Sequence, residues 1–457
     1  MSSRKRAFFA MATGILVAAT PAPAADTRPN ILIILIDDHG YNDLSIHGCT
    51  DVATPHMDSI AKNGVRCTNG YVSCPQCSPT RAGLMTGRYQ QRFGHEFNAA
   101  VPDSALSLQE TTLADRLKSA GYATGLVGKW HLGSDEQHHP MSRGFQEFFG
   151  FLGGANPYMP QSPKGTVPRI LRGKDDANER SYLTEAFGRE AAAFIARHRQ
   201  EPFFLYLAFN ATHGPMQAMK ADLDRFAAIK NETRRIHAAK TSVLDAAVGR
   251  VLDQLRSAGL EDNTLIFFFN DNGGPTDVNA SSNAPLRGVK GETREGGIRV
   301  PFFVQWKGKL PAGKTYDRPV IQLDIFPTVL EAAGVSIPAD GKLDGVSLLP
   351  YLTGHKSGAP HETLYWRFNF PPNRPDHYKW AIRQGDWKLF TDIDAGRTRS
   401  DQPVKDGNLR LVNLANDISE SHDLSAQHPE KVKAMRASWE KWNAEMAPSV
   451  PRRQRRG

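Results

Sequence analysis

The sequence lacks the features that mark membrane-embedded, fibrous or disordered chains. Its 457 residues include only four cysteines, 40% are hydrophobic and 23% are charged, and no internal repeat or long low-complexity segment stands out. This composition is typical of a globular protein with a large core. The length fits two or three domains, or one large α/β domain with a small one.

The apolar run near the N-terminus is too short for a membrane span. It covers residues 7–19, follows Arg4, Lys5 and Arg6, and precedes the small residues 22–25. A transmembrane helix needs about 20 apolar residues, whereas a basic start, a short apolar run and small residues are typical of a secretory signal peptide. We therefore expect residues 1–25 to be a signal peptide rather than a retained anchor. The mature protein is expected to be exported, to the periplasm or beyond it.

The excess of positive charge lies mainly at the two ends of the chain. The formal net charge is +8, but three basic residues belong to the signal segment and four to the tail at 449–457. The remaining body is nearly neutral, which argues against a nucleic-acid partner. We interpret the basic tail as a solvated end, although a short basic tail could also contact an anionic polymer or a membrane surface.

The distribution of apolar runs predicts an α/β fold. Residues 31–36, 203–209 and 264–269 are continuous apolar runs, as expected for strands that are buried on both faces of a mostly parallel sheet. A further short strand is expected at 123–127. Helical segments are expected between and after the strands, over 54–64, 77–87, 113–120, 183–199, 234–258 and 326–333. This alternation predicts a large, mostly parallel sheet sandwiched by helices at residues 26–355.

The pattern of the sequence changes beyond about residue 356. Short aromatic strands are expected at 364–368, 380–383, 387–390 and 410–413, and a terminal helix at 429–445. We predict that residues 356–448 form a small C-terminal α+β domain, in which an antiparallel sheet packs on a helix.

Polar residues with useful chemistry follow four of the expected strands. They are Asp37 and Asp38, Lys129 and His131, His213, and Asp271 and Asn272. In doubly wound sheets the ligand site lies beyond the carboxyl ends of the strands, so these side chains are expected to meet. Each alone would more often be a cap or a turn residue.

The expected site combines oxygen ligands with positive charge. Asp37, Asp38, Asp271 and Asn272 offer only oxygen atoms, which suit a hard cation such as Ca²⁺ or Mg²⁺, although paired acids can also be helix caps. Positive charge and proton donors come from Arg81, Lys129, His131, His213 and Lys290. Such a surplus beside a cation indicates an anionic substrate, either a sulfate or a phosphate.

Cys77 opens the segment C-S-P-T-R, which is predicted to begin a helix that Gly87 stops. The positive end of the helix dipole would stabilise an anion formed at this position. A structural interpretation is also open, because Cys74 and Cys77 could bridge each other or pair with Cys49 or Cys67.

The motifs together resemble those of the type I sulfatases, in the alkaline phosphatase superfamily. The resemblance rests on CSPTRAGLMTGRY, GKWHLG, FNATHGP, FFFNDNGG and LRGVKGETREGGIRVP, and covers most of the chain. Thr80 stands where the family most often has serine, and Thr212 where it often has proline. In the segment at 151–158 we assign no sulfate-binding residue.

The resemblance implies a chemistry and a set of roles. Cys77 would be converted after translation to formylglycine by a maturation enzyme. One calcium ion per subunit would be held by Asp37, Asp38, Asp271, Asn272 and the modified residue. Arg81 and Lys129 would stabilise the hydrated aldehyde, and His131 would assist its regeneration. His213 and Lys290 would bind the sulfate and protonate the leaving alcohol, with a covalent sulfate ester as intermediate.

The expected function is hydrolysis of a sulfate monoester, on a sulfated carbohydrate. The aromatic segment 365–378 would line a sugar subsite or belong to the core. Two alternatives stay open from the sequence: a phosphodiesterase or phosphonate monoester hydrolase of the same superfamily, and a protein that binds sulfated glycans without turnover if Cys77 is not converted. The sequence predicts no membrane span in the mature protein.

Overall fold

The computed structural model describes residues 28–98, 105–159, 169–337, 342–369, 378–392 and 409–448. The predicted signal peptide at 1–25 and the basic tail at 449–457 lie outside the described residues. No helix within the described ranges is long and apolar enough to cross a membrane.

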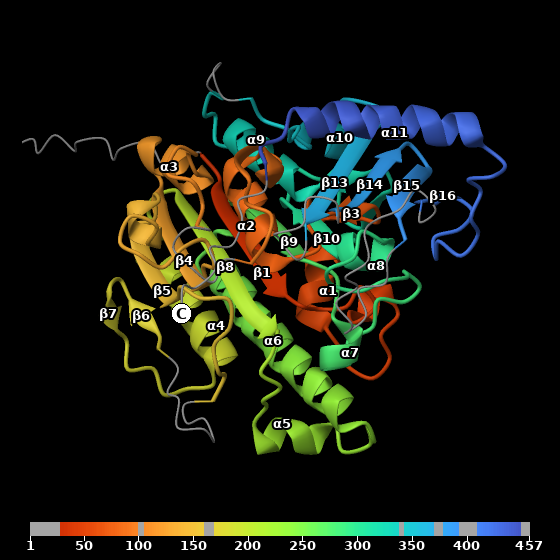
Figure 1. Cartoon of the computed structure of the whole chain (residues 1–457). Coiled ribbons are helices and arrows are strands. Elements are labelled where there is room, and N and C mark those ends of the chain that lie inside the picture. Colours follow the sequence, from red (N-terminus) through yellow and green to blue (C-terminus); the bar gives the residue numbers. More distant parts are fainter. Residues whose placement is uncertain are drawn as a thin grey trace, which may run out of the picture.

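A mixed, mostly parallel sheet forms the centre of the molecule (Figure 1). Five neighbouring strands at its middle, from β9 to β5, run parallel, whereas β10 runs antiparallel to β9. In the described residues the strand order across the sheet is β11 (Lys314–Tyr316), β2 (Val65–Cys67), β10 (Phe302–Gln305), β9 (Thr264–Asn270), β1 (Asn30–Asp37), β8 (Phe203–Thr212), β4 (Ala123–Lys129), β5 (Glu147–Phe151), β6 (Leu171–Arg172) and β7 (Asp175–Asp176).

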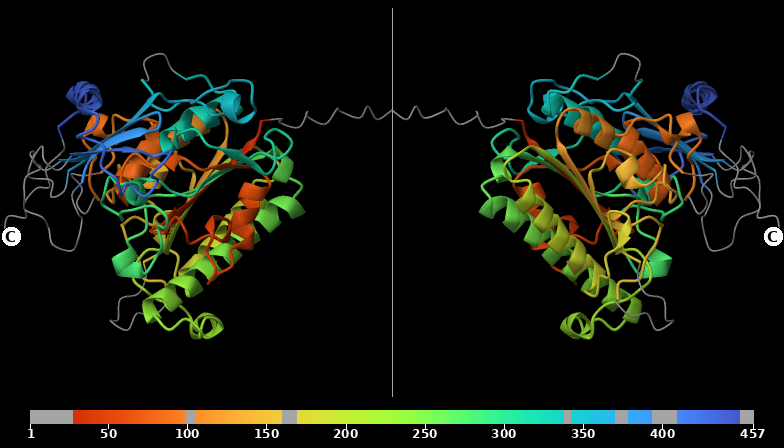
Figure 2. Two further views of the ribbon diagram at one scale, coloured as in Figure 1. Left: turned by 90° about the vertical axis from the view of Figure 1, so that its right-hand side faces the viewer. Right: turned by 90° about the vertical axis from the view of Figure 1, so that its left-hand side faces the viewer.

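Helices cover both faces of this sheet, as Figure 2 shows with the sheet seen nearly edge-on. On one face lie α1 (Pro55–Lys62), α4 (Leu183–Arg197) and α6 (Glu232–Ser257). On the other lie α2 (Cys77–Thr86), α3 (Leu113–Ser119) and α9 (Ile325–Ala332). Alternate residues of β1 enter the two cores: Ile31 and Ile33 pack on the second face, and Leu32 and Ile34 on the first. A continuous apolar run is what a strand between two such cores requires.

A second, antiparallel sheet packs beside the first one (Figure 1). Its strands are β13 (Thr363–Asn369), β14 (Tyr378–Gln384), β15 (Trp387–Thr391) and β16 (Leu409–Asn413), and α11 (Pro429–Ala444) covers it. The core between them includes Trp366, Trp380 and Trp439. The fold class predicted from the sequence, a large α/β sheet with a small antiparallel sheet and helix, is confirmed.

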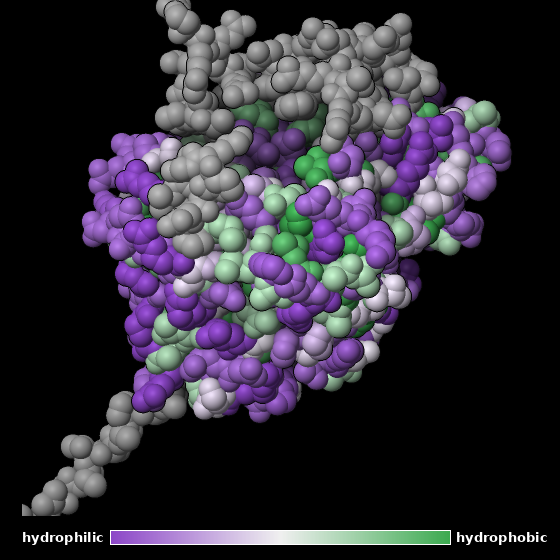
Figure 3. Space-filling model, turned by 90° about the horizontal axis from the view of Figure 1, so that it is seen from below, coloured by the Kyte–Doolittle hydropathy of each residue, from purple (hydrophilic) through white to green (hydrophobic). Residues whose placement is uncertain are grey.

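Short elements complete the connections. They are β3 (Gly70–Tyr71) and β12 (Val320–Ile321), which pair with each other, and the helices α5 (Lys220–Arg225), α7 (Thr276–Asn279), α8 (Glu295–Ile298) and α10 (Leu349–Leu352). Seen from below, the surface is largely hydrophilic and its hydrophobic residues form small patches (Figure 3).

Two strands are longer than the sequence predicts. The predicted ends coincided with the last apolar residue, but β4 continues to Lys129 and β8 to Thr212. The reason is pairing: Lys129 pairs with Phe151 of β5, and Thr212 pairs with Asp37 of β1. Backbone hydrogen bonds thus carry the strands beyond their apolar stretches and fix the polar residues at their ends.

Candidate active site

Cys77 is the first residue of α2 and is fully buried. The helix ends at Gly87, whose φ of 66° is the left-handed conformation that glycine adopts readily. Burial raises the pKa of the Cys77 thiol to about 12, although Lys129 and Lys290 act in the opposite direction. All four cysteines are free, so the structure does not support a disulfide at Cys74 or Cys77. An unmodified cysteine at this position is a neutral thiol and a poor nucleophile.

Carboxylates surround Cys77 because β1 and β9 are parallel neighbours that end at the same edge. Ile36 pairs with Asn270, so Asp37 and Asp38 emerge beside Asp271. One ligand atom from each of Asp37, Asp38, Cys77 and Asp271 lies within 4.8 Å of the others. Four of the five sequence-predicted metal ligands are therefore brought together, and the fifth, Asn272, contacts Asp38.

Two buried oxygen atoms in this cluster lack partners. Oδ1 of Asp271 and Oδ1 of Asn272 accept no hydrogen bond from the described part of the chain. The amide nitrogen of Asn272 donates to Asp38 Oδ1 at 2.7 Å, which leaves its oxygen available. A buried acceptor without a partner costs about 1–3 kcal/mol, and a cation removes that cost. The residues thus fit a hard divalent ion with oxygen ligands.

Buried cations balance the carboxylates. Arg81 donates from Nη2 and Nε to Asp271 Oδ2 at 2.7 and 3.1 Å, and from Nη1 to the carbonyl of Lys129 at 3.0 Å. Lys129 Nζ lies 2.5 Å from Asp37 Oδ2. Burial alone would raise the pKa of Asp37, but the charges of Lys129, His213 and Arg81 hold it well below its usual range. Burial and the neighbouring Asp37 raise the pKa of Asp271 to about 6.

Lys290 and His213 stand on the more open side of the cluster. Lys290 Nζ lies 2.6 Å from Asp38 Oδ1 and 3.2 Å from Cys77 Sγ, and its side chain is 15% exposed. His213 Nε2 lies 3.5 Å from Asp38 Oδ2, while Nδ1 lies 2.8 Å from the carbonyl of Gly214. Both side chains can therefore meet an anion that approaches Cys77.

His131 is the remaining predicted residue, and it is almost fully buried. It has a positive φ of 61°, and its Nδ1 atom has no hydrogen-bond partner within the described ranges. Burial, together with the charges of Lys129 and Arg81, lowers its pKa well below the ordinary value. The imidazole is thus neutral, because its surroundings disfavour a positive charge on the ring.

Sequence reasoning missed Lys240 on α6. The side chain is fully buried and donates to the carbonyl oxygens of Thr212, His213 and Pro215 at 3.0, 2.6 and 3.2 Å. A signal was present, because Lys240 lies on the inward-facing stripe of α6 that continues through Leu244, Val248, Val251 and Leu255. A lysine on such a stripe indicates a buried partner.

The loop that carries Lys290 is tied to the small sheet. Lys379 donates to the carbonyl of Gly291 at 3.1 Å. Farther along, Glu295 and Glu420 both bind the buried ammonium group of Lys388, at 2.8 and 2.7 Å. The small sheet therefore fixes the segment that follows Lys290.

The aromatic segment at 365–378 is mainly core where it is described. Trp366 and Phe368 are buried, and the ring of Tyr365 stacks on Trp442 with centroids 5.1 Å apart. Residues 370–377 lie outside the described ranges. No sugar subsite is assigned to this segment.

A scan against family models decides the family of the chain. Residues 29–335 match the sulfatase model. The chain belongs to the sulfatase family. Residues 291–436 of this sulfatase also match the C-terminal model of N-sulphoglucosamine sulphohydrolase. The sequence-based resemblance is confirmed, and the protein is a sulfuric ester hydrolase.

Curated relatives agree with this assignment. The sulfatase is 31% identical to the uncharacterized sulfatase YdeN of Escherichia coli (strain K12), over 89% of this chain and 84% of YdeN. It is 35% identical to N-acetylgalactosamine-6-sulfatase of Homo sapiens, over 72% of this chain and 67% of the human enzyme.

Solved structures give the same result. The crystal structure of Ps i-CgsB in complex with k-i-k-neocarrahexaose superimposes with a TM-score of 0.85 and 34% identity, covering 94% of this chain and 95% of the other. The phosphonate monoester hydrolase of Agrobacterium radiobacter shares the fold, with a TM-score of 0.64, at only 20% identity over 90% of this chain and 96% of that one.

Proposed function

We propose that this sulfatase hydrolyses sulfate monoesters of a carbohydrate, with Cys77 converted to formylglycine. The observation that carries the proposal is the setting of Cys77, whose Sγ lies 3.2 Å from Lys290 Nζ and beside the carboxylates of Asp37, Asp38 and Asp271. A hydrated aldehyde at this position supplies an oxygen nucleophile, which the buried neutral thiol does not.

The cation is proposed to be one Ca²⁺ per subunit. Its ligands would be Asp37, Asp38, Asp271, Asn272 and the modified residue 77. The unpaired oxygens of Asp271 and Asn272 support this assignment. When bound, the ion supplies positive charge for the sulfate oxygens.

His213 is assigned the protonation of the leaving alcohol. Its Nδ1 donates to the carbonyl of Gly214 at 2.8 Å, so Nε2 is the nitrogen that gains and loses a proton. Lys290 Nζ is assigned to a sulfate oxygen, because it already lies beside residue 77. Together they bind the anion and neutralise charge that develops on the departing oxygen.

Arg81, Lys129 and His131 are assigned to residue 77 and its surroundings. Arg81 and Lys129 hold Asp271 and Asp37 in place and provide the positive field in which a hydrated aldehyde is stabilised. His131, whose Nδ1 has no hydrogen-bond partner among the described residues, is assigned to accept the proton that is released when the aldehyde is restored.

The carbohydrate substrate class is supported by relatives. Ps i-CgsB binds a neocarrahexaose, and other relatives are named N-acetylgalactosamine-6-sulfatases, although steryl-sulfatases of Mus musculus and Rattus norvegicus also match. Export to the periplasm is proposed from the signal segment at 1–25, and conversion of Cys77 needs a maturation enzyme in the host.

The test is mass spectrometry of residue 77 together with kinetics on a nitrophenyl sulfate. The protein is made in a host that has the maturation enzyme, and an aldehyde at residue 77 is expected. Cys77→Ala should lose at least about 1,000-fold in kcat while keeping the thermal unfolding midpoint of the parent protein. A nitrophenyl phosphodiester serves as comparison and should react more slowly.

Two results would contradict the proposal. One is an unmodified Cys77 with no hydrolysis, in which case retained binding of sulfated oligosaccharides would indicate a binding protein. The other is faster hydrolysis of the phosphodiester than of the sulfate, which would indicate a phosphodiesterase.

A further inference from the structure

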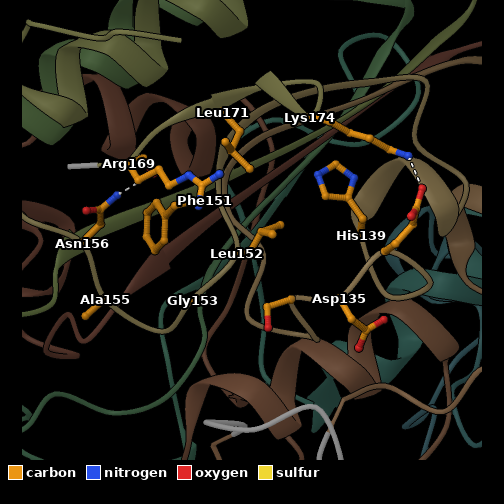
Figure 4. Close-up of a pocket in the computed structure, with 12 residues that line it drawn as sticks. Asp135, His139, Phe151, Leu152, Gly153, Ala155, Asn156, Arg169, Leu171 and Lys174 are labelled. Carbon is orange, nitrogen blue, oxygen red and sulfur yellow. Dashed lines mark hydrogen bonds and ion pairs between the residues drawn. The ribbon is translucent and has the colours of Figure 1, made fainter. Parts of the chain in front are cut away.

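A pocket of about 540 Å³ lies beside the active site and has no role in the chemistry described above. Three segments line it, at 134–139, 151–156 and 169–174, and none of the residues assigned to the metal or to catalysis is among them (Figure 4). It is formed where the loops that follow β4 and β5 meet the β6–β7 hairpin.

The main chain at Gly154 lies between this pocket and His131. A Cβ atom added at Gly154 would lie 2.6 Å from His131 Nε2, so the backbone here touches the imidazole. Gly153 and Ala155, on either side of Gly154, line the pocket. The pocket therefore adjoins the segment that packs on His131, next to the residues around Cys77.

The pocket combines an apolar wall with hydrogen-bond donors, as sugar-binding sites do. Phe151, Leu152 and Leu171 provide the apolar part, and Arg169 and Asn156 lie beside Phe151 (Figure 4). Asn156 donates through Nδ2 to the carbonyl of Arg169 at 3.4 Å, which ties the two residues together.

Of the two basic side chains that line the pocket among the described residues, Lys174 is in an ion pair and Arg169 is not. Two carboxylates also line it, but Glu136 pairs with Lys174 at 2.8 Å, and Asp135 contacts His138 at 2.7 Å. The exposed guanidinium group of Arg169 has no ion pair in the described part of the chain. A free guanidinium binds an oxyanion through two parallel hydrogen bonds.

His139 adds an unused donor. The ring is 5% exposed, and its Nδ1 accepts the main-chain N–H of Met141 at 3.3 Å, so the hydrogen of the neutral ring is on Nε2. Nε2 has no hydrogen-bond partner among the described residues. Burial and the charge of Lys174 lower the pKa of His139, which keeps the ring neutral.

We propose that this pocket binds an anionic sugar unit of the substrate, next to the unit whose sulfate reacts, with Arg169 paired to its sulfate or carboxylate group. The proposal rests on the proposed carbohydrate sulfatase function and extends it, because it makes the enzyme selective for oligosaccharides over single sugars.

The test compares Arg169→Gln with the parent enzyme on substrates of different size. Sulfated galactan oligosaccharides carry a second sulfate, whereas oligosaccharides of N-acetylgalactosamine 6-sulfate and a uronate carry a carboxylate, so the pair identifies the anion. On the oligosaccharide that the parent enzyme prefers, we expect kcat/KM to fall about 10- to 100-fold, mainly through KM, as for loss of a charged hydrogen bond. Activity on a nitrophenyl sulfate should stay within about twofold, because this substrate does not reach the pocket.

Arg180→Gln is the matched control, because Arg180 is exposed and does not line the pocket. An equal loss on the oligosaccharide and the aryl sulfate, or no loss on either, would overturn the proposal. Oligosaccharide affinity is also measured by calorimetry in a Cys77→Ala background, where Arg169→Gln should raise Kd by a similar factor. This readout separates the two hypotheses: a parent enzyme without turnover refutes the proposed function, whereas an unchanged Kd refutes the pocket.

Discussion

The ammonium nitrogen of Lys240 lies 2.6 Å from the carbonyl oxygen of His213. The same nitrogen lies 4.0 Å from the ring centroid of Tyr158, whose hydroxyl also donates to the His213 carbonyl, at 2.9 Å. The main chain of a residue assigned to the leaving group is thus held from α6 and from the loop after β5. Lys240 acts as a positioning residue, since it contacts the backbone and not the reacting atoms.

Replacing Lys240 should therefore impair catalysis. We expect Lys240→Met to lower kcat/KM for a nitrophenyl sulfate by about 10- to 100-fold, because a displacement of about 1 Å in a catalytic group has this effect. The matched control is Arg250→Met, an exposed position on the same helix. A folded Lys240→Met protein with unchanged kcat/KM would contradict the positioning role.

The same lysine predicts a dependence of stability on pH. Burial lowers the pKa of Lys240 from 10.5 to about 7, despite the charges of Asp37 and Asp38. Between these two values the unfolded chain binds more protons than the native state, so the contribution of Lys240 to the free energy of unfolding rises with pH. The difference in free energy of unfolding, parent minus Lys240→Met, should rise from pH 7 to pH 10 by at most about 1.4 kcal/mol per pH unit. Denaturant titrations measure it, and a difference that is flat or falls with pH would show that Lys240 remains charged.

Removing the charge of Asp271 should remove the metal. Asp271→Asn keeps the shape of the side chain but removes its negative charge, at a residue whose Oδ1 has no partner in the described part of the chain. We expect loss of bound calcium by elemental analysis and a fall in kcat of at least about 100-fold. Asp253→Asn, at an exposed position of α6, is the control. Full calcium content in the Asp271 variant would exclude this residue as a ligand.

The buried ammonium group of Lys388 should matter for both stability and activity. Lys388→Met leaves Glu295 and Glu420 without their common partner, and breaking a buried ion pair costs about 3–5 kcal/mol. Chemical denaturation should report this loss. Because Glu295 follows Lys290 by one short loop, kcat/KM should fall as well. A loss of less than about 1 kcal/mol would mean that the two carboxylates are protonated or hydrated in the variant.

Much of the fold could be predicted because its signals are local. The run at 31–36 and the stop at Gly87 follow from burial on two faces and from a left-handed helix end, and both appear where expected. The convergence of Asp37 with Asp271 was also predictable, because parallel strands place their carboxyl ends at one edge.

Other features depend on contacts between residues that are far apart in the sequence, and the sequence alone does not reveal these contacts. The sequence shows that Arg81 follows Cys77 by four residues. It does not show that Arg81 contacts Asp271, which is 190 positions away. Lys240 presents the same difficulty, since its acceptors are backbone carbonyls that leave no pattern in side-chain types. The pocket at Arg169 requires three segments to meet, and none of them carries a motif.

The attachment of the Lys290 loop to the small sheet affects how the protein unfolds. The core of the small sheet also includes Tyr71 of β3 and Ile298 of α8, and Trp366 donates to the carbonyl of Val72 at 2.7 Å. Lys290 lies on a loop that is attached to the small sheet. The active site is therefore lost when the small sheet separates from the rest of the protein. Heating should therefore produce a single calorimetric transition, and the loss of activity and the change in tryptophan fluorescence should follow the same curve. A fragment without the small sheet should have no active site that works.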